Sequence, residues 1–270
     1  MNASLEYAEE LRTFSPIVFD GLTFYPLSVK HFALYQNAKA AMELMLGSLP
    51  VRFVKLSWIQ ALDALDEEAK QSNIATGYLG SFLLLLATAL RLDVHLDHNA
   101  LMLGRHDDGK LSAIVVRQGK EQAPVALTDK NLPKVREILA AQNGYTIPDE
   151  NWNPELVRAQ AYLREKGSSS KTGGSLEDAV CALAAATGRR SAEIWDWSIR
   201  EFMQMQSAVD RRLRFLLCGA AELSGQVKFT KGNPYPTWIW ENKSELPTGF
   251  TDLNDLDKGA GGTLAIPKKE

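Results

Sequence analysis

The sequence is poor in the residues that form disulfides and metal sites. Its 270 residues include two cysteines and four histidines, and no Cys-x-x-Cys pair occurs, which excludes a zinc knuckle. Cys181 and Cys218 each lie among apolar neighbours in stretches with helical periodicity. We therefore expect two buried, reduced thiols and no disulfide.

An excess of basic charge is also missing. The chain has 30 lysines and arginines against 33 acidic residues, with a net charge of −3 and a pI of about 5.9. Proteins that bind nucleic acid through its phosphates usually present a basic surface. The charge balance therefore does not favour nucleic acid as a partner.

The chain has no long hydrophobic run. The most apolar stretch, 79–90, is shorter than the roughly 20 residues needed to cross a bilayer, and it contains Gly80, Ser81 and Thr88. Residues 1–12 are polar and acidic, unlike a secretory signal. Because 45% of the residues are apolar and 23% are charged, we expect a folded, soluble, cytoplasmic protein with no membrane partner.

Catalytic and phosphate-binding motifs are missing as well. The segment 167–174, GSSSKTGG, contains Lys171 and Thr172, but the order of glycines and lysine differs from a phosphate loop and no strand precedes it. The serines at 168–170 have no nearby histidine or Gly-x-Ser-x-Gly elbow. We predict that this segment is a linker and that the protein is not an enzyme.

Three of the four histidines lie close together in the sequence, with aspartates between them. Imidazole and carboxylate groups can hold a divalent metal. Strand and turn geometry would scatter these side chains, so solvated turns are the favoured interpretation and we expect no cofactor. The cluster consists of His95, His98 and His106 with Asp97, Asp107 and Asp108.

The first 166 residues predict a helical unit that contains a small antiparallel β meander. Asp20-Gly21 between two apolar segments is typical of a hairpin turn. Apolar periodicity predicts the helices, and alternation with β-branched residues predicts the strands. The expected elements are a hairpin at 17–25, helices at 28–46, 51–69, 76–92, 131–142 and 154–166, and the meander around 94–127.

Residues 175–225 predict a module of three helices. Ser175 with Asp178, and Ser198 with Glu201, form Ser-x-x-acid boxes that satisfy free backbone donors at a helix start. The last helix is long and ends at Gly225. Its apolar stripe, at steps of three or four, comprises Phe202, Met205, Val209, Leu213, Leu216, Ala220 and Leu223.

The same region bears a superficial likeness to a helix-turn-helix. Arg189 and Arg190 fall at its turn and Arg200 lies on the following helix. Readers of the major groove carry arginine, asparagine or glutamine on an exposed face, whereas this helix begins Ser198-Ile-Arg-Glu-Phe-Met. DNA binding is therefore disfavoured.

Two further features have a structural and a functional interpretation each. A basic cluster of Arg211, Arg212 and Arg214 is either a solvated face paired with acids such as Asp210 or a contact face for an acidic partner. The tail, 226–270, carries Tyr235, Trp238 and Trp240 among prolines, and its end is expected to be mobile. These aromatics form either a strap on the protein's own helices or a docking segment for another chain.

The sequence of residues 175–205, SLEDAV…AAATGRRSAEIWDWSIREF, resembles the small helical module of phage tail assembly chaperones. In that module a helix ends in glycine, a Ser-x-Glu-x-Trp helix follows, and a serine- or threonine-capped helix begins. Three other segments are similar to uncharacterised tail-region proteins of phages and prophages. They are 132–144, 153–156, and AELSG at 221–225 together with NPYPTW at 233–238.

The resemblance implies a mainly α-helical, non-enzymatic protein of the host cytoplasm that binds the tape-measure protein during tail assembly. An unshielded helical chain with apolar stripes would aggregate, and a helical groove with flexible methionines such as Met42, Met45, Met203 and Met205 can cover it. A structural tail or baseplate protein is the alternative, and self-association is possible. The expected partner-binding residues are Trp195, Trp197, Phe202, Met205, Arg211, Arg212, Arg214, Tyr235, Trp238 and Trp240.

Overall fold

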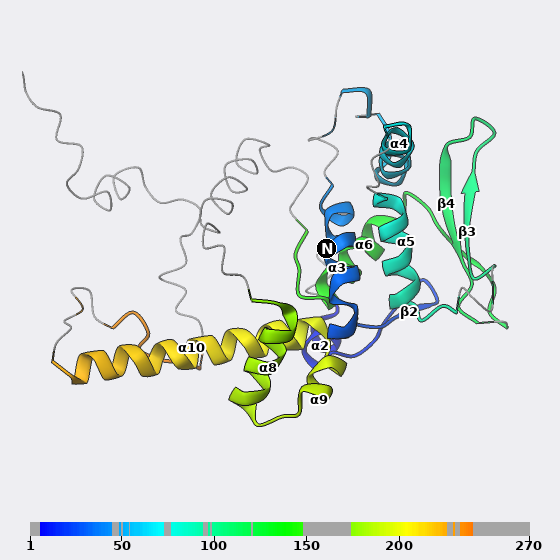
Figure 1. Cartoon of the computed structure of the whole chain (residues 1–270). Helices are drawn as coiled ribbons and strands as arrows, with labels where there is room; N and C mark the ends of the chain where they lie inside the picture. The colour runs from blue at the N-terminus through cyan, green and yellow to red at the C-terminus, as the bar shows by residue number, and fades with distance from the viewer. Residues whose placement is uncertain are drawn as a thin grey trace, which may run out of the picture. The chain divides into compact units, whose positions relative to one another are not determined.

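The computed structural model describes residues 6–44, 49, 51–53, 55–72, 77–93, 97, 99–119, 121–147, 174–225, 229 and 233–239. The fold is mainly helical with two small antiparallel sheets, as predicted (Figure 1). The chain forms two compact units, Met1–Met205 and Gln206–Glu270, and the division falls inside one helix.

In the first half of the chain, the elements from the first hairpin onward follow the predicted order, and the short helix before that hairpin was not predicted. The helices are α2 (Ala8–Thr13), η1 (Val29–His31), α3 (Phe32–Glu43), η3 (Val51–Phe53), α4 (Trp58–Gln71), α5 (Tyr78–Ala89) and α6 (Leu132–Gln142). The strands are β1 (Ile17–Phe19), β2 (Leu22–Phe24), β3 (Leu101–Arg105), β4 (Leu111–Val116) and β5 (Val125–Leu127). The second half contributes α8 (Leu176–Thr187), α9 (Ser191–Asp196) and α10 (Ile199–Leu223).

The hairpin of β1 and β2 turns where the sequence predicts. Asp20 and Gly21 both have positive φ, 53° and 77°, which is the backbone that a two-residue type I′ turn requires. The register pairs Ile17 with Phe24, and both side chains are buried. The turn therefore directs one apolar face of the hairpin into the core.

The helix expected at 51–69 begins later than predicted. Residues Val51–Phe53 form a short 3-10 turn, and α4 starts only at Trp58. The Gln60 side chain accepts a hydrogen bond from the Ser57 backbone N–H at 3.3 Å. This contact is half of a capping box, and it explains why the apolar periodicity upstream of Ser57 does not continue the helix.

The apolar run at 79–90 forms α5, which packs against α3 and α4. Phe82, Leu85 and Leu86 are fully buried, and the Phe82 ring meets Trp58 of α4 edge-on with 4.9 Å between centroids. Leu84 is the exception, because 55% of its surface is exposed. The predicted core helix is thus confirmed, except that one of its leucines faces outward.

The predicted meander is a three-stranded antiparallel sheet in the order β3-β4-β5. Leu111, Ile114 and Val116 of the central strand are buried in the main core. Residues 94–96, which the sequence pattern adds to the meander, lie outside the described residues, as do His95 and His98.

Helix α6 supplies a buried cation that stabilises the end of α3. Arg136 is only 4% exposed and donates from Nε to the Met42 carbonyl at 2.6 Å and from Nη2 to the Leu44 carbonyl at 3.0 Å. Its guanidinium also lies over the Trp58 ring, 4.9 Å from the centroid. The last carbonyls of a helix lack intrahelical donors and attract positive charge, so Arg136 satisfies them where water is excluded.

The three helices predicted after residue 175 are confirmed. The Asp178 backbone N–H donates to Ser175 Oγ at 3.1 Å and Asp178 Oδ2 accepts from the Ser175 N–H at 2.8 Å, as the capping box requires. Gly188 ends α8 in the left-handed conformation, with a φ of 70°. Ser198 Oγ accepts the Glu201 N–H at 3.1 Å and caps α10.

This helical segment is joined to the N-terminal elements within the first unit. The Val29 N–H donates to the Trp197 carbonyl at 2.9 Å, and the Ile199 N–H donates to the Leu27 carbonyl at 2.8 Å. Ile199 is fully buried in the same core as the hairpin. The predicted linker at 167–174 lies almost wholly outside the described residues, so the domain boundary expected there stays a prediction.

The two cysteines are free, but the expectation that both are buried is wrong. Cys181 is exposed and Cys218 is partly exposed. Helix α8 buries the stripe that contains Val180 and Leu183, and Cys181 lies beside that stripe rather than in it. Helical periodicity locates a buried stripe but does not define its width.

Several predictions fall on residues outside the described part of the chain. They are the helix at 154–166, Trp240 and the tail beyond it. Among the described residues, we find no helix with the length and apolar character needed to span a membrane.

Candidate interaction surface on helix α10

The predicted apolar stripe of α10 is covered at its start and open further along. Phe202 is 2% exposed, whereas Leu213 and Leu216 are each 54% exposed and Leu223 is 90% exposed. Leu217, beside the stripe, is exposed as well. Large apolar side chains left in water at regular spacing are typical of an interaction surface.

The open part of the stripe has coiled-coil spacing, and we call it the α10 seam. Its members, Val209, Leu213, Leu216, Ala220 and Leu223, follow one another at alternating steps of four and three. This 3-4 alternation repeats every seven residues and is the pattern by which two helices pack along their lengths. The spacing favours a helical occupant aligned with α10.

The aromatic tail segment contacts α10 within the second unit, and we call residues 233–239 the strap. Arg214 Nη1 donates to the Tyr235 hydroxyl at 2.8 Å, and Arg211 Nε donates to the Trp238 carbonyl at 3.4 Å. Asn233 Nδ2 donates to Glu222 Oε2 at 3.2 Å. The basic cluster and the aromatic segment, predicted separately, are therefore partners of each other.

The strap and the seam occupy opposite faces of α10. Successive residues of an α-helix are rotated by about 100°. Arg211, Arg214 and Glu222, which hold the strap, are thus rotated by about 140°, 160° and 120° from Leu216 at the middle of the seam. The strap leaves the seam uncovered, although it adds two exposed side chains of its own, Trp238 and Ile239.

The charges beside the seam are unequally paired. Arg214 Nε lies 2.8 Å from Asp210 Oδ2. The pKa of Arg214 is raised, first by its hydrogen bond to Tyr235 and second by the Asp210 carboxylate. The Arg212 guanidinium is exposed and lies 5.9 Å from the Trp238 ring centroid. Within the described part of the chain, Arg212 makes no ion pair, so its exposed positive charge lies next to the seam with only the Trp238 ring beside it.

The other predicted contact residues belong to the first unit. Trp195 and Trp197 are half-buried around the end of α9, and the Trp197 carbonyl is used by Val29. Phe202 is buried, while Met205 keeps 37% of its surface exposed. The structure therefore brings together Arg211, Arg212, Arg214, Tyr235 and Trp238, buries Phe202, and uses the Trp197 carbonyl as an acceptor for Val29.

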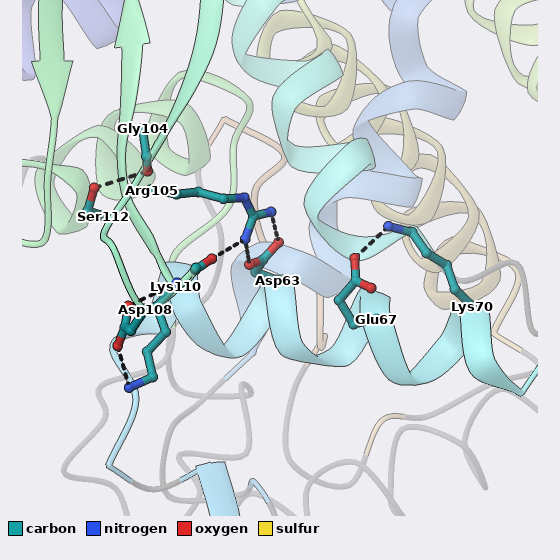
Figure 2. Close-up of polar contacts among 9 residues, drawn as sticks. Asp63, Glu67, Lys70, Gly104, Arg105, Asp108, Lys110 and Ser112 are labelled. Atoms are coloured by element: carbon teal, nitrogen blue, oxygen red, sulfur yellow. Dashed lines mark hydrogen bonds and ion pairs between the residues drawn. The ribbon is translucent and has the colours of Figure 1, made fainter.

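A polar cluster that the sequence pattern did not reveal joins β3 to α4 (Figure 2). Arg105 donates to both carboxylate oxygens of Asp63 and to the Gly109 carbonyl, and Lys110 pairs with Asp108 at 2.9 Å. Figure 2 shows Glu67 and Lys70 as a separate pair further along α4. Each carboxylate already faces a cation. The cluster is therefore suited to fixing β3 against α4 rather than to transferring protons.

The described residues contain no group of three potential metal ligands. His106 is exposed in the turn after β3, with Asp107 and Asp108 beside it. The other two histidines of the predicted cluster lie outside the described residues.

Comparisons with protein-family models, with curated proteins and with solved structures each found no match. The candidate function is therefore inferred from the chain's own residues, with the α10 seam as its most distinctive surface.

Proposed function

We propose that this chain is a non-enzymatic phage tail assembly chaperone that binds the tape-measure protein through helix α10. The supporting observation is the α10 seam, in which Leu213, Leu216 and Leu223 stay largely in water. The resemblance of residues 175–205 to the chaperone module supports the same function. An exposed stripe of this kind gains free energy by covering an apolar stripe on another helix.

Shielding is a suitable task for such a surface. A long helical chain with open apolar stripes aggregates unless those stripes are covered until assembly. Leucine contacts are non-directional and tolerate sequence variation, so one seam can cover many stretches of a long client. Release follows when the subunits of the tail tube assemble around the client and compete for the same apolar area.

Co-expression with the tape-measure protein of the same source tests this function. We expect co-purification and a larger soluble fraction of the client. Leu216→Glu should abolish both, because a carboxylate cannot be buried unpaired in an apolar contact. Leu84→Glu is the matched control, since Leu84 is 55% exposed on α5 and Leu216 is 54% exposed on α10.

Two results would contradict the proposal. One is a tape-measure protein that stays soluble and assembles normally without this chain. The other is recovery of the chain in purified particles at the stoichiometry of a structural subunit, measured by mass spectrometry, which would favour a retained tail or baseplate component.

A further inference from the structure

We infer that the α10 seam binds an amphipathic helix whose heptad apolar stripe is flanked by carboxylates, and that it discriminates against helices with basic flanks. This inference shares the α10 seam with the proposed function and rests on that function in no other respect. It specifies the chemistry of the occupant, which the resemblance does not.

The spacing of the seam defines the occupant's secondary structure and length. From Val209 to Leu223 the seam covers about four helical turns, roughly 22 Å at 1.5 Å per residue. Alternating steps of three and four match helices that cross at a shallow angle of about 20°. An extended peptide would meet such leucines with the wrong period, so the occupant is a helix of comparable length.

The charges around the seam define the occupant's flanks. Among the described residues of the second unit, three arginines outnumber the two acids, Asp210 and Glu222, which gives a local net charge of +1. Arg212 directly precedes the seam residue Leu213, a position that borders the partner in paired helices. Since Asp210 already pairs with Arg214, and no other carboxylate among the described residues pairs with Arg212, an occupant with a carboxylate at its flank complements this cation.

The same charges argue against a second copy of this chain as the occupant. A copy would bring its own Arg212 to the flank, and its Asp210 is already paired with its Arg214, so it offers Arg212 no unpaired carboxylate. The strap is also unsuited, because it is held by Arg211, Arg214 and Glu222 on the opposite face of α10. An acidic-flanked helix of another protein satisfies both the leucines and Arg212.

Two synthetic helical peptides provide the test without knowledge of the client. Both carry the same isoleucine and leucine heptads, one with glutamate and the other with lysine at every flanking position. Uniform flanking charge disfavours pairing of each peptide with itself. Binding to the full chain is measured by fluorescence anisotropy at two salt concentrations.

We expect the acidic peptide to bind about tenfold more tightly than the basic peptide at low salt, with a smaller difference at high salt because exposed charges are screened. Leu216→Glu should abolish binding of both peptides. Arg212→Gln should weaken the acidic peptide by about two- to fivefold, as for an exposed ion pair, and leave the basic peptide unchanged. Arg190→Gln, at an exposed position before α9, is the matched control.

Two outcomes would overturn the inference. Equal affinities for the two peptides would remove the charge selection. A concentration-dependent dimer that blocks peptide binding and disappears in Leu216→Glu, measured by sedimentation, would make a second copy the occupant.

The peptides also separate this inference from the proposed function. Selective binding of the acidic peptide without rescue of the tape-measure protein would retain the inference and reject the function. Rescue of the client with no preference between the peptides would retain the proposed function and reject the inference.

Discussion

Arg105 and Asp63, 42 residues apart in sequence, form a two-pronged ion pair with distances of 2.6 and 2.8 Å between their nitrogen and oxygen atoms. The pair connects the edge strand β3 to α4 (Figure 2). The Asp63 side chain is largely buried, whereas Arg105 remains partly hydrated. Such a bidentate contact determines orientation as well as distance, so it sets how β3 and its partner strand β4 lie on α4.

Loss of this pair should destabilise the first unit measurably. We expect Asp63→Asn to lower the free energy of unfolding by about 1–2 kcal/mol, the range for hydrogen bonds to a charged group. Chemical denaturation monitored by circular dichroism provides the measurement. Glu67→Gln, in the exposed pair with Lys70, should change the free energy of unfolding much less than Asp63→Asn does. Equal effects of the two substitutions would show that the Asp63 contact is not special.

Arg136 should be among the most sensitive positions outside the apolar core. Arg136→Met removes the donors to the Met42 and Leu44 carbonyls and leaves buried acceptors unpaired. We expect a loss of about 2–4 kcal/mol in the free energy of unfolding. Arg136→Lys keeps the charge and should recover part of the lost free energy of unfolding. Thermal denaturation provides the measurement. A methionine variant as stable as the parent would mean that water replaces the guanidinium.

Stability should fall at alkaline pH because of Tyr35. Burial, and secondarily the charge of Glu43, raises the pKa of Tyr35 above its ordinary value of 10.0. Above about pH 10 the unfolded chain releases this phenolic proton while the folded chain retains it, so the free energy of unfolding decreases as pH rises. The tyrosinate absorbance of Tyr35 should appear only with unfolding. Tyr35→Phe should move the alkaline midpoint upward, and an unchanged midpoint would contradict the assignment.

The two cysteines should differ in reactivity although both are free. Under native conditions we expect iodoacetamide to modify Cys181 faster than Cys218, because Cys181 is exposed and Cys218 is partly covered. Mass spectrometry of peptides sampled over time measures the two rates. In denaturant the rates should converge. A native preference for Cys218 would mean that the face of α8 carrying Cys181 is covered in solution.

The sequence contained enough local information to predict most elements. The Asp20-Gly21 turn, the Ser175 box and the stops at Gly188 and Gly225 depend on residues within a few positions of one another. The start of α4 was missed because the apolar pattern extends upstream of Ser57, although Ser57-x-x-Gln60 is a capping-box sequence that marks where the helix begins.

Contacts between distant residues could not be predicted in the same way. The cation of Arg136 and the carboxylate of Asp63 find partners on other elements, and no periodicity records such a pairing. In the candidate site, the seam leucines and the arginines were identified from sequence. Their separation onto two faces follows from the helical rotation per residue, but the binding of the strap to one face required the positions of Arg214 and Tyr235 in space.

The heptad character of the α10 seam has a consequence for stoichiometry. A surface that repeats every seven residues meets a repeating partner equally well after each displacement of about 10 Å along the helix axis. A long client therefore presents a one-dimensional lattice of overlapping sites rather than one address. The number of bound copies would then grow in proportion to the length of the client, and a short client would saturate at very few.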